Sequence, residues 1–134
     1  MVTRTFHLIL IVSSDPDRLN ARHGAIRHAG YHALPTRTVS HAVILAHKAR
    51  PSVVLTDSAL DDGRALSLVR ALRTHEALRQ VPVILLGVLL PDEEDLVAHD
   101  PHTHVHAAAE EATLMTVVEN LLVASRAASL SLPQ

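Results

Sequence analysis

The sequence has no cysteine and no tryptophan among its 134 residues. The first absence excludes disulfides, thiolate metal sites and cysteine nucleophiles. Aromatic side chains are nearly absent as well, with one phenylalanine and one tyrosine, so the core has to be built from leucine, valine, isoleucine and alanine. Such a core is typical of parallel strands that are covered on both faces of their sheet.

Glycine and lysine are equally scarce. The four glycines form no glycine-rich phosphate loop, which argues against P-loop and dinucleotide-binding proteins. The chain also lacks the Gly-x-Ser-x-Gly segment of many serine hydrolases. The only lysine is Lys48. We therefore expect a protein that is not an enzyme.

The charge and hydropathy patterns exclude further classes. The formal net charge is −2, so no strong positive field attracts nucleic acid. The apolar run Leu8–Val12 is too short for a signal peptide, and no segment reaches the ~20 apolar residues of a membrane span. We expect a cytoplasmic protein with neither a nucleic-acid nor a membrane partner. Its length predicts a single domain over residues 1–134, with a core at about 6–126 and a polar tail at 127–134.

Apolar segments alternate with helical patterns along the whole chain. The predicted strands are residues 8–12, 31–34, 53–56, 81–86 and 104–106. The predicted helices are residues 16–29, 41–48, 64–75, 91–98 and 110–126. We expect Asp15 or Ser14 to cap the first helix and Ser40 to cap the second. The alternation predicts an α/β fold, with a parallel sheet covered on both faces and right-handed crossovers.

Asp57 is the residue whose position is most informative. It follows the apolar residues 53–56 and begins a loop that ends at Gly63. This order puts one carboxylate at the C-terminal end of a buried parallel strand, where open α/β sheets bind their ligands. A carboxylate in that place suits a metal ion or a phosphoryl group.

Three segments together resemble the receiver domain of bacterial two-component response regulators. They are residues 8–12, 50–57 and 81–86, and the resemblance spans about residues 6–124. It implies a flavodoxin-like (CheY-like) three-layer α/β/α sandwich with a five-stranded parallel sheet of order 2-1-3-4-5. It also implies a stand-alone module of signal transduction and phosphorelay, with a histidine kinase or an output protein as its partner.

In that family an acidic pair joins the aspartate of the third strand to bind Mg²⁺, while a hydroxyl residue and a lysine hold the phosphoryl oxygens. The resemblance assigns the phosphoacceptor position to Asp57. It assigns the acidic-pair positions to Ser13 and Ser14. The hydroxyl position falls on Gly87 and the lysine position on Ala107. Four of the five chemical groups are therefore missing.

These losses affect the metal first. Hydroxyl groups are weak ligands for Mg²⁺ compared with carboxylates, and each lost charge-assisted donor costs about 1.5–3 kcal/mol. We therefore expect no cofactor, and phosphotransfer to Asp57 that is lost or strongly weakened. Asp15, Asp61 and Asp62 are the neighbouring carboxylates that can restore Mg²⁺ binding beside Asp57.

Histidine is unusually frequent, with eleven copies. His99, His102, His104 and His106 have a spacing that can bind Zn²⁺, Ni²⁺ or Cu²⁺, although surface histidines without a native metal also fit. His104 also falls on the position of the switch aromatic in receivers. A histidine there titrates near neutral pH.

The predicted last helix has a wide apolar stripe. Its members are Leu114, Met115, Val117, Val118, Leu121, Leu122 and Val123. Most of the stripe should pack on the sheet. In receivers, the face formed by helix four, strand five and helix five makes dimers and output contacts. We therefore predict a homodimer or partner site there, centred on His104, Met115 and Leu122.

Three functions remain open on the sequence. The leading hypothesis is a degenerate receiver that acts as a protein-interaction module. The second is a working receiver that a histidine kinase phosphorylates on Asp57. The third is a metal-binding protein that uses the histidine cluster at residues 99–106.

Overall fold

The computed structural model describes residues 7–107 and 114–123. Helices and strands alternate along both stretches. In chain order they are β1 (Leu8–Val12), α1 (Pro16–His28), β2 (His32–Thr36), α2 (Val39–Ala49), β3 (Val53–Asp57), β4 (Ala59–Leu60), β5 (Gly63–Arg64), α3 (Ala65–Arg73), the 3-10 turn η1 (Glu76–Leu78), β6 (Val83–Leu86), α4 (Pro91–Ala98) and β7 (Thr103–His106). Residues 114–123 form a further helix.

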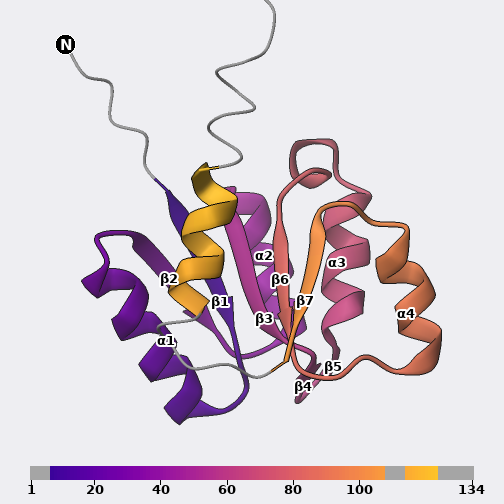
Figure 1. The fold of residues 1–134 in the computed structure, drawn as a ribbon, viewed down its shortest axis with the longest axis horizontal. Coiled ribbons are helices and arrows are strands. Elements are labelled where there is room, and N and C mark those ends of the chain that lie inside the picture. Colours follow the sequence, from indigo (N-terminus) through magenta and orange to yellow (C-terminus); the bar gives the residue numbers. More distant parts are fainter. Residues whose placement is uncertain (1–6, 108–113, 124–134) are drawn as a thin grey trace, which may run out of the picture.

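A five-stranded sheet forms the middle layer, in the order β2-β1-β3-β6-β7. Every neighbouring pair in it is parallel. Helix α1 and the 114–123 helix cover one face of the sheet, and α2 and α3 cover the other (Figure 1). The predicted flavodoxin-like sandwich with sheet order 2-1-3-4-5 is confirmed.

The period of two along β1 divides the core between the two faces. Ile9 and Ile11 pack with α1 and the 114–123 helix, whereas Leu10 and Val12 pack with α2 and α3. These four side chains are at most 1% exposed. The aliphatic composition thus fills two thin layers without aromatic side chains. Among the described residues, no helix has the length and hydropathy to cross a bilayer.

Several boundaries differ from the sequence-based prediction; α2 spans Val39–Ala49 instead of 41–48, and β6 begins at Val83 instead of residue 81. Strand β2 continues through Pro35, because β2 is an edge strand and proline needs no partner on its outer side. Helix α3 ends at Arg73, and the 3-10 turn follows it. The segment after Asp57, predicted as a loop, forms the small antiparallel hairpin β4–β5. The predicted ends of the last helix lie outside the described residues.

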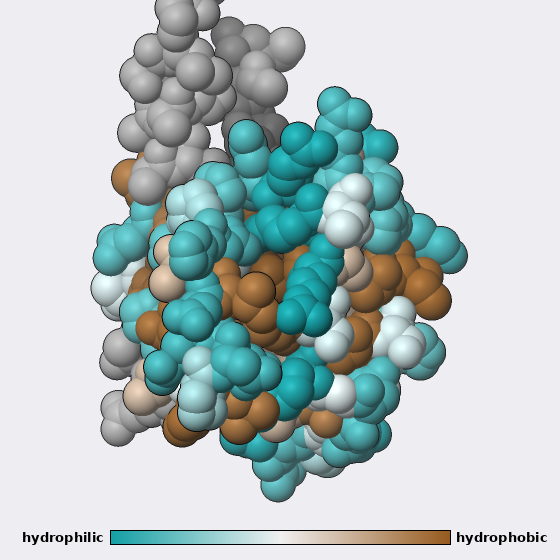
Figure 2. Space-filling model, turned by 90° about the vertical axis from the view of Figure 1, so that its right-hand side faces the viewer, coloured by the Kyte–Doolittle hydropathy of each residue, from teal (hydrophilic) through white to brown (hydrophobic). Residues whose placement is uncertain are grey.

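Two ion pairs hold α4 against α3. At the start of both helices, Arg64 Nη2 lies 2.7 Å from Glu93 Oε1. At their ends, Arg73 Nε lies 2.8 Å from Asp100 Oδ2. Glu93 also accepts a hydrogen bond from the backbone N–H of Leu90 at 2.8 Å, which satisfies a free donor at the start of α4. On this side of the molecule, hydrophobic surface appears as separate patches among hydrophilic residues (Figure 2).

The cap of α2 provides a test of local structure. Thr38, and not the predicted Ser40, is the N-cap, and its Oγ1 accepts a hydrogen bond from the His41 N–H at 3.2 Å. We expect Thr38→Ala to lower the free energy of unfolding by about 1 kcal/mol. Urea denaturation measures this change. Ser67→Ala, at an exposed position within α3, is the control and should leave stability nearly unchanged or slightly higher.

The ion pair between Arg64 and Glu93 should make the stability of the fold sensitive to acid. The hydrogen bond from Arg64 lowers the pKa of Glu93 below its ordinary value of 4.5, although burial opposes the shift. A lowered pKa contributes stability that is present above about pH 4.5 and is lost as the pH falls through the folded-state pKa. Glu93→Gln should therefore lose stability less steeply than the natural chain below pH 4.5. Denaturation at a series of pH values measures both slopes, and equal slopes would contradict the assignment.

Candidate functional site

Asp57 ends the central strand β3, between the ends of β1 and β6. Ser13 directly follows β1, and Gly87 directly follows β6. Because the carboxyl ends of parallel strands meet at one edge of a sheet, these residues converge there. Asp57 itself is only 5% exposed.

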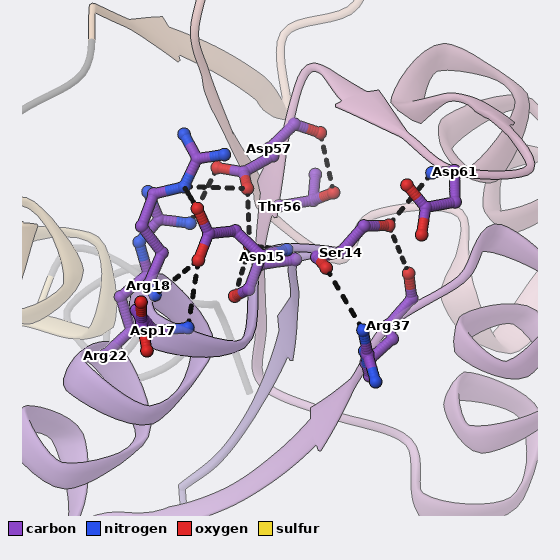
Figure 3. A network of polar contacts seen from close by, with 10 residues as sticks. Ser14, Asp15, Asp17, Arg18, Arg22, Arg37, Thr56, Asp57 and Asp61 are labelled. Atoms are coloured by element: carbon purple, nitrogen blue, oxygen red, sulfur yellow. Dashed lines mark hydrogen bonds and ion pairs between the residues drawn. The ribbon is translucent and has the colours of Figure 1, made fainter.

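Each carboxylate oxygen of Asp57 accepts a hydrogen bond from a neighbouring side chain. Arg22 Nη1 donates to Asp57 Oδ1 at 2.7 Å, and both side chains are buried. Ser13 Oγ donates to Asp57 Oδ2 at 2.6 Å. Arg18 lies farther off, with its Nε 3.8 Å from Asp57 Oδ2 and its side chain 56% exposed. Figure 3 shows both arginines approaching the carboxylate from the side of α1.

Arg18 and Arg22 are the arginines at this carboxylate that the sequence analysis missed, and Arg22 is the buried one of the two. It lies on the buried side of α1 with Leu19 and Ile26, at spacings of i, i+3 and i+7. An arginine within an apolar helical stripe is a detectable signal, because a buried charge needs a partner of opposite sign. The sequence does not show which of the fourteen acidic residues that partner is.

Ser14 and Asp61 connect the loop after β1 to the β4–β5 hairpin. Ser14 Oγ donates to the Arg37 carbonyl at 2.6 Å and accepts from the Asp61 N–H at 2.9 Å. Ser14 therefore fixes three loops in place and does not contact Asp57. Within the described residues, Asp61 joins this network through its backbone.

The other two candidate carboxylates act as helix caps. Asp15 is the N-cap of α1, and its Oδ1 accepts from the N–H groups of Asp17 and Arg18 at 2.9 and 3.2 Å. The hydrogen bond from Arg18 is the main reason that the pKa of Asp15 is lowered. Asp62 accepts from the N–H groups of Val39 and Ser40 at 2.8 and 3.1 Å, at the start of α2. Both carboxylates thus satisfy orphan helix donors.

The residues at the hydroxyl and lysine positions add no donor side chain. Gly87 has φ = 129°, a conformation that favours glycine. A Cβ atom there would collide with Ser58 Oγ, so Ser58 fills the space that a side chain at position 87 needs. Ala107 follows β7, is exposed and carries only a methyl group.

A divalent cation does not fit this donor set. The carboxylate oxygens of Asp57 already accept charge-assisted or hydroxyl hydrogen bonds, and a guanidinium occupies the place beside Oδ1. A cation brought next to Arg22 would meet a fixed like charge at low exposure. Within the described residues, no three histidine or acidic side chains converge on one point. The candidate Mg²⁺ set of Asp15, Asp57 and Asp61 is therefore not brought together.

The histidine cluster does not form a metal site within the described residues either. His99 Nδ1 lies 2.7 Å from the carbonyl of Asp95, as part of the end of α4. The backbone N–H of His102 donates to Asp100 Oδ1 at 2.9 Å. His104 is half-buried on β7, and burial is the main cause that lowers its pKa, followed by the charges of His106 and His102.

The predicted dimer face needs a correction at its centre. Leu122 is 5% exposed and packs with Leu114 and Val118 on the sheet, so it is not available to a partner. Met115 is half-buried against the same core. The exposed apolar side chain of this helix is Val123, at 66% exposure. The extra width of the stripe is used mainly inside the molecule.

No family model matches the sequence, and no curated protein matches it. Solved structures of receiver domains do match over most of the chain. A chemotaxis response regulator of Vibrio cholerae superposes with a TM-score of 0.78 at 18% identity, covering 87% of this chain and 99% of that one. The receiver domain of a histidine kinase from Syntrophus aciditrophicus gives 0.78 at 24% identity, covering 88% and 91%.

A third neighbour is a structure with a magnesium ion coordinated in its active-site cleft. It is the receiver domain of a sensor histidine kinase from Pseudomonas aeruginosa, with a TM-score of 0.75 at 24% identity, covering 87% of this chain and 98% of that one. Identities this low establish the shared fold. The chain therefore has the fold of response-regulator receivers.

The buried ion pair predicts strong coupling between Arg22 and Asp57. We expect Arg22→Met and Asp57→Leu each to lower the free energy of unfolding by about 3–5 kcal/mol, because each leaves an unpaired buried charge. The double variant should be more stable than either single variant. Urea denaturation of the four proteins gives the coupling energy. Arg18→Met is the control and should cost under about 1 kcal/mol, since its ion pair is exposed. Additive losses would contradict the pairing.

Proposed function

We propose that this chain is a degenerate receiver domain that acts in two-component signalling by binding another protein, with phosphotransfer to Asp57 lost or strongly weakened. The observation that carries this proposal is the buried hydrogen-bonded ion pair between Arg22 and Asp57. The receiver fold of its structural neighbours supports the signalling role. Those neighbours are named as a response regulator and as a part of a histidine kinase, so a histidine kinase or an output protein is the partner that we propose.

Phosphorylation of an aspartate requires a free carboxylate oxygen. A phosphorus–oxygen bond forms to the carboxylate while the bond to the donor breaks, and negative charge gathers around the transferred group. In this chain Asp57 Oδ1 is held by Arg22 and Asp57 Oδ2 by Ser13, with 5% of the residue exposed. An incoming phosphoryl group would first have to break a buried charge-assisted pair, which adds several kcal/mol to the barrier. Each 1.4 kcal/mol slows the reaction about tenfold.

The groups that would stabilise the transferred phosphoryl are also unsupported. Ser13 uses its hydroxyl on Asp57, and Ser14 uses its hydroxyl on loop backbone. Gly87 and Ala107 offer no side-chain donor. Arg18 is a nearby exposed cation, and its Nε lies 3.5 Å from Asp15 Oδ2 and 3.8 Å from Asp57 Oδ2. In the competing function, a working phosphoacceptor, Arg18 is the group among these that would donate to the phosphoryl oxygens.

The test is incubation of the purified protein with acetyl phosphate and Mg²⁺, followed by intact-mass measurement. We expect no added phosphoryl mass, while an ordinary receiver treated in parallel is modified. A phosphoryl adduct that disappears in Asp57→Asn would overturn the proposal and support the working phosphoacceptor. Arg22→Met, with a more accessible carboxylate, serves as the matched variant. Slow labelling of Arg22→Met beside an unlabelled natural chain would assign the block to Arg22.

A further inference from the structure

Helices α3 and α4 enclose an open groove with a volume of about 650 Å³. Its wall is partly apolar and includes Leu66, Val69 and Val97. Leu96 lines the same groove and is 44% exposed, although it is a large apolar side chain. An exposed leucine beside a groove marks a surface that can gain stability when a partner covers it.

The groove is positively charged, although the chain as a whole has a net charge of −2. Three arginines line it, against the single acidic residue Asp100. Arg73 is neutralised by Asp100. Arg70 and Arg79 are exposed, and within the described residues neither forms an ion pair at contact distance. An occupant of this groove should therefore bring negative charge.

The exposed side of α4 carries negative charge, as an occupant of this groove should. Asp92, Asp95, Leu96 and His99 follow one another at spacings of i, i+3, i+4 and i+7, so they lie along one face of the helix. All four are exposed. The face begins acidic, has Leu96 in its middle and ends beside the arginines of the groove. The exposed face of α4 and the groove beside it thus carry charges of opposite sign.

We propose that the α3–α4 groove binds a second copy of this chain, with the two α4 helices antiparallel across a two-fold axis. Asp92 and Asp95 of each copy then lie against Arg70 and Arg79 of the other. The two Leu96 side chains meet near the axis. A surface that complements itself in this way satisfies the rule for a two-fold dimer, in which the same patch serves on both sides.

This inference goes beyond the proposed function, since it adds a second copy of the same chain to the histidine kinase or output protein that we propose as the partner. An interface built from a few side chains of two short helices buries little area, and small interfaces give weak or transient complexes. We therefore expect a dissociation constant in the micromolar range. Added salt should weaken the dimer, because exposed charge pairs are screened.

Sedimentation equilibrium from micromolar to millimolar protein tests the proposal. The charge reversals Arg70→Glu/Arg79→Glu and Asp92→Arg/Asp95→Arg should each raise the dissociation constant at least about 100-fold, because like charges then face each other. An equimolar mixture of the two variants should regain a dimer. In that mixed pair each acidic surface faces a basic one, so recovery also shows that both variants fold.

Two controls separate this face from others. Arg27→Glu on α1, on the other side of the sheet, and Val123→Asp on the 114–123 helix should leave dimerisation unchanged. The milder pair Arg70→Gln/Arg79→Gln should weaken the dimer with less risk to folding. A natural chain that stays monomeric at millimolar concentration overturns the proposal, as does a dimer that the reversals do not change or a mixture that stays monomeric.

The two proposals fail in different ways. A chain that dimerises through α4 and also takes up a phosphoryl group at Asp57 contradicts the proposed function alone. A chain that stays monomeric and unlabelled contradicts the dimer alone.

Discussion

The hydrogen-bonded ion pair between Arg22 and Asp57 is the contact on which this end of the sheet depends. Two opposite charges, both nearly excluded from water, lie 2.7 Å apart. Removing such groups from water costs several kcal/mol each, so each is tolerable only with the other present. The pair therefore ties α1 to the end of β3 and fixes the orientation of the carboxylate. Ser13 completes the arrangement by donating to the second oxygen.

The acidic residues near the carboxyl-terminal ends of these strands also stabilise the fold. Asp15 caps α1, Asp62 accepts hydrogen bonds from the first N–H groups of α2, and Glu93 accepts one at the start of α4 while it pairs with Arg64. Ligands usually bind at the carboxyl-terminal ends of the strands of an open parallel sheet. In this chain the carboxylates there are used by helix ends and by arginines. The Arg22–Asp57 ion pair at this place joins α1 to the end of β3.

Away from the site, the ion pairs between α3 and α4 likewise use charged side chains to stabilise the packing of the fold. They join the helices at both ends and leave the groove between them open. Arg70 and Leu96, which line the groove, therefore lie on helices whose packing is stabilised by contacts within the chain.

Much of the fold could be predicted because its signals are local. The apolar runs have the right lengths for buried strands, and the first helix begins where Asp15 and Pro16 predict it. The prediction failed where a neighbour decides the outcome. Pro35 remains in a strand because β2 is at the edge, and Leu122 is buried because the sheet lies under it.

The sequence by itself determined the alternation of strands and helices, the position of Asp57 and the lack of donor side chains at positions 87 and 107. These follow from residue type and short-range spacing. Only the tertiary structure decided that Arg22, 35 residues earlier, is the partner of Asp57. A contact over that separation depends on the crossover and on the packing of α1, which bring one of many charged residues to the carboxylate. Spacing along the chain does not encode that choice.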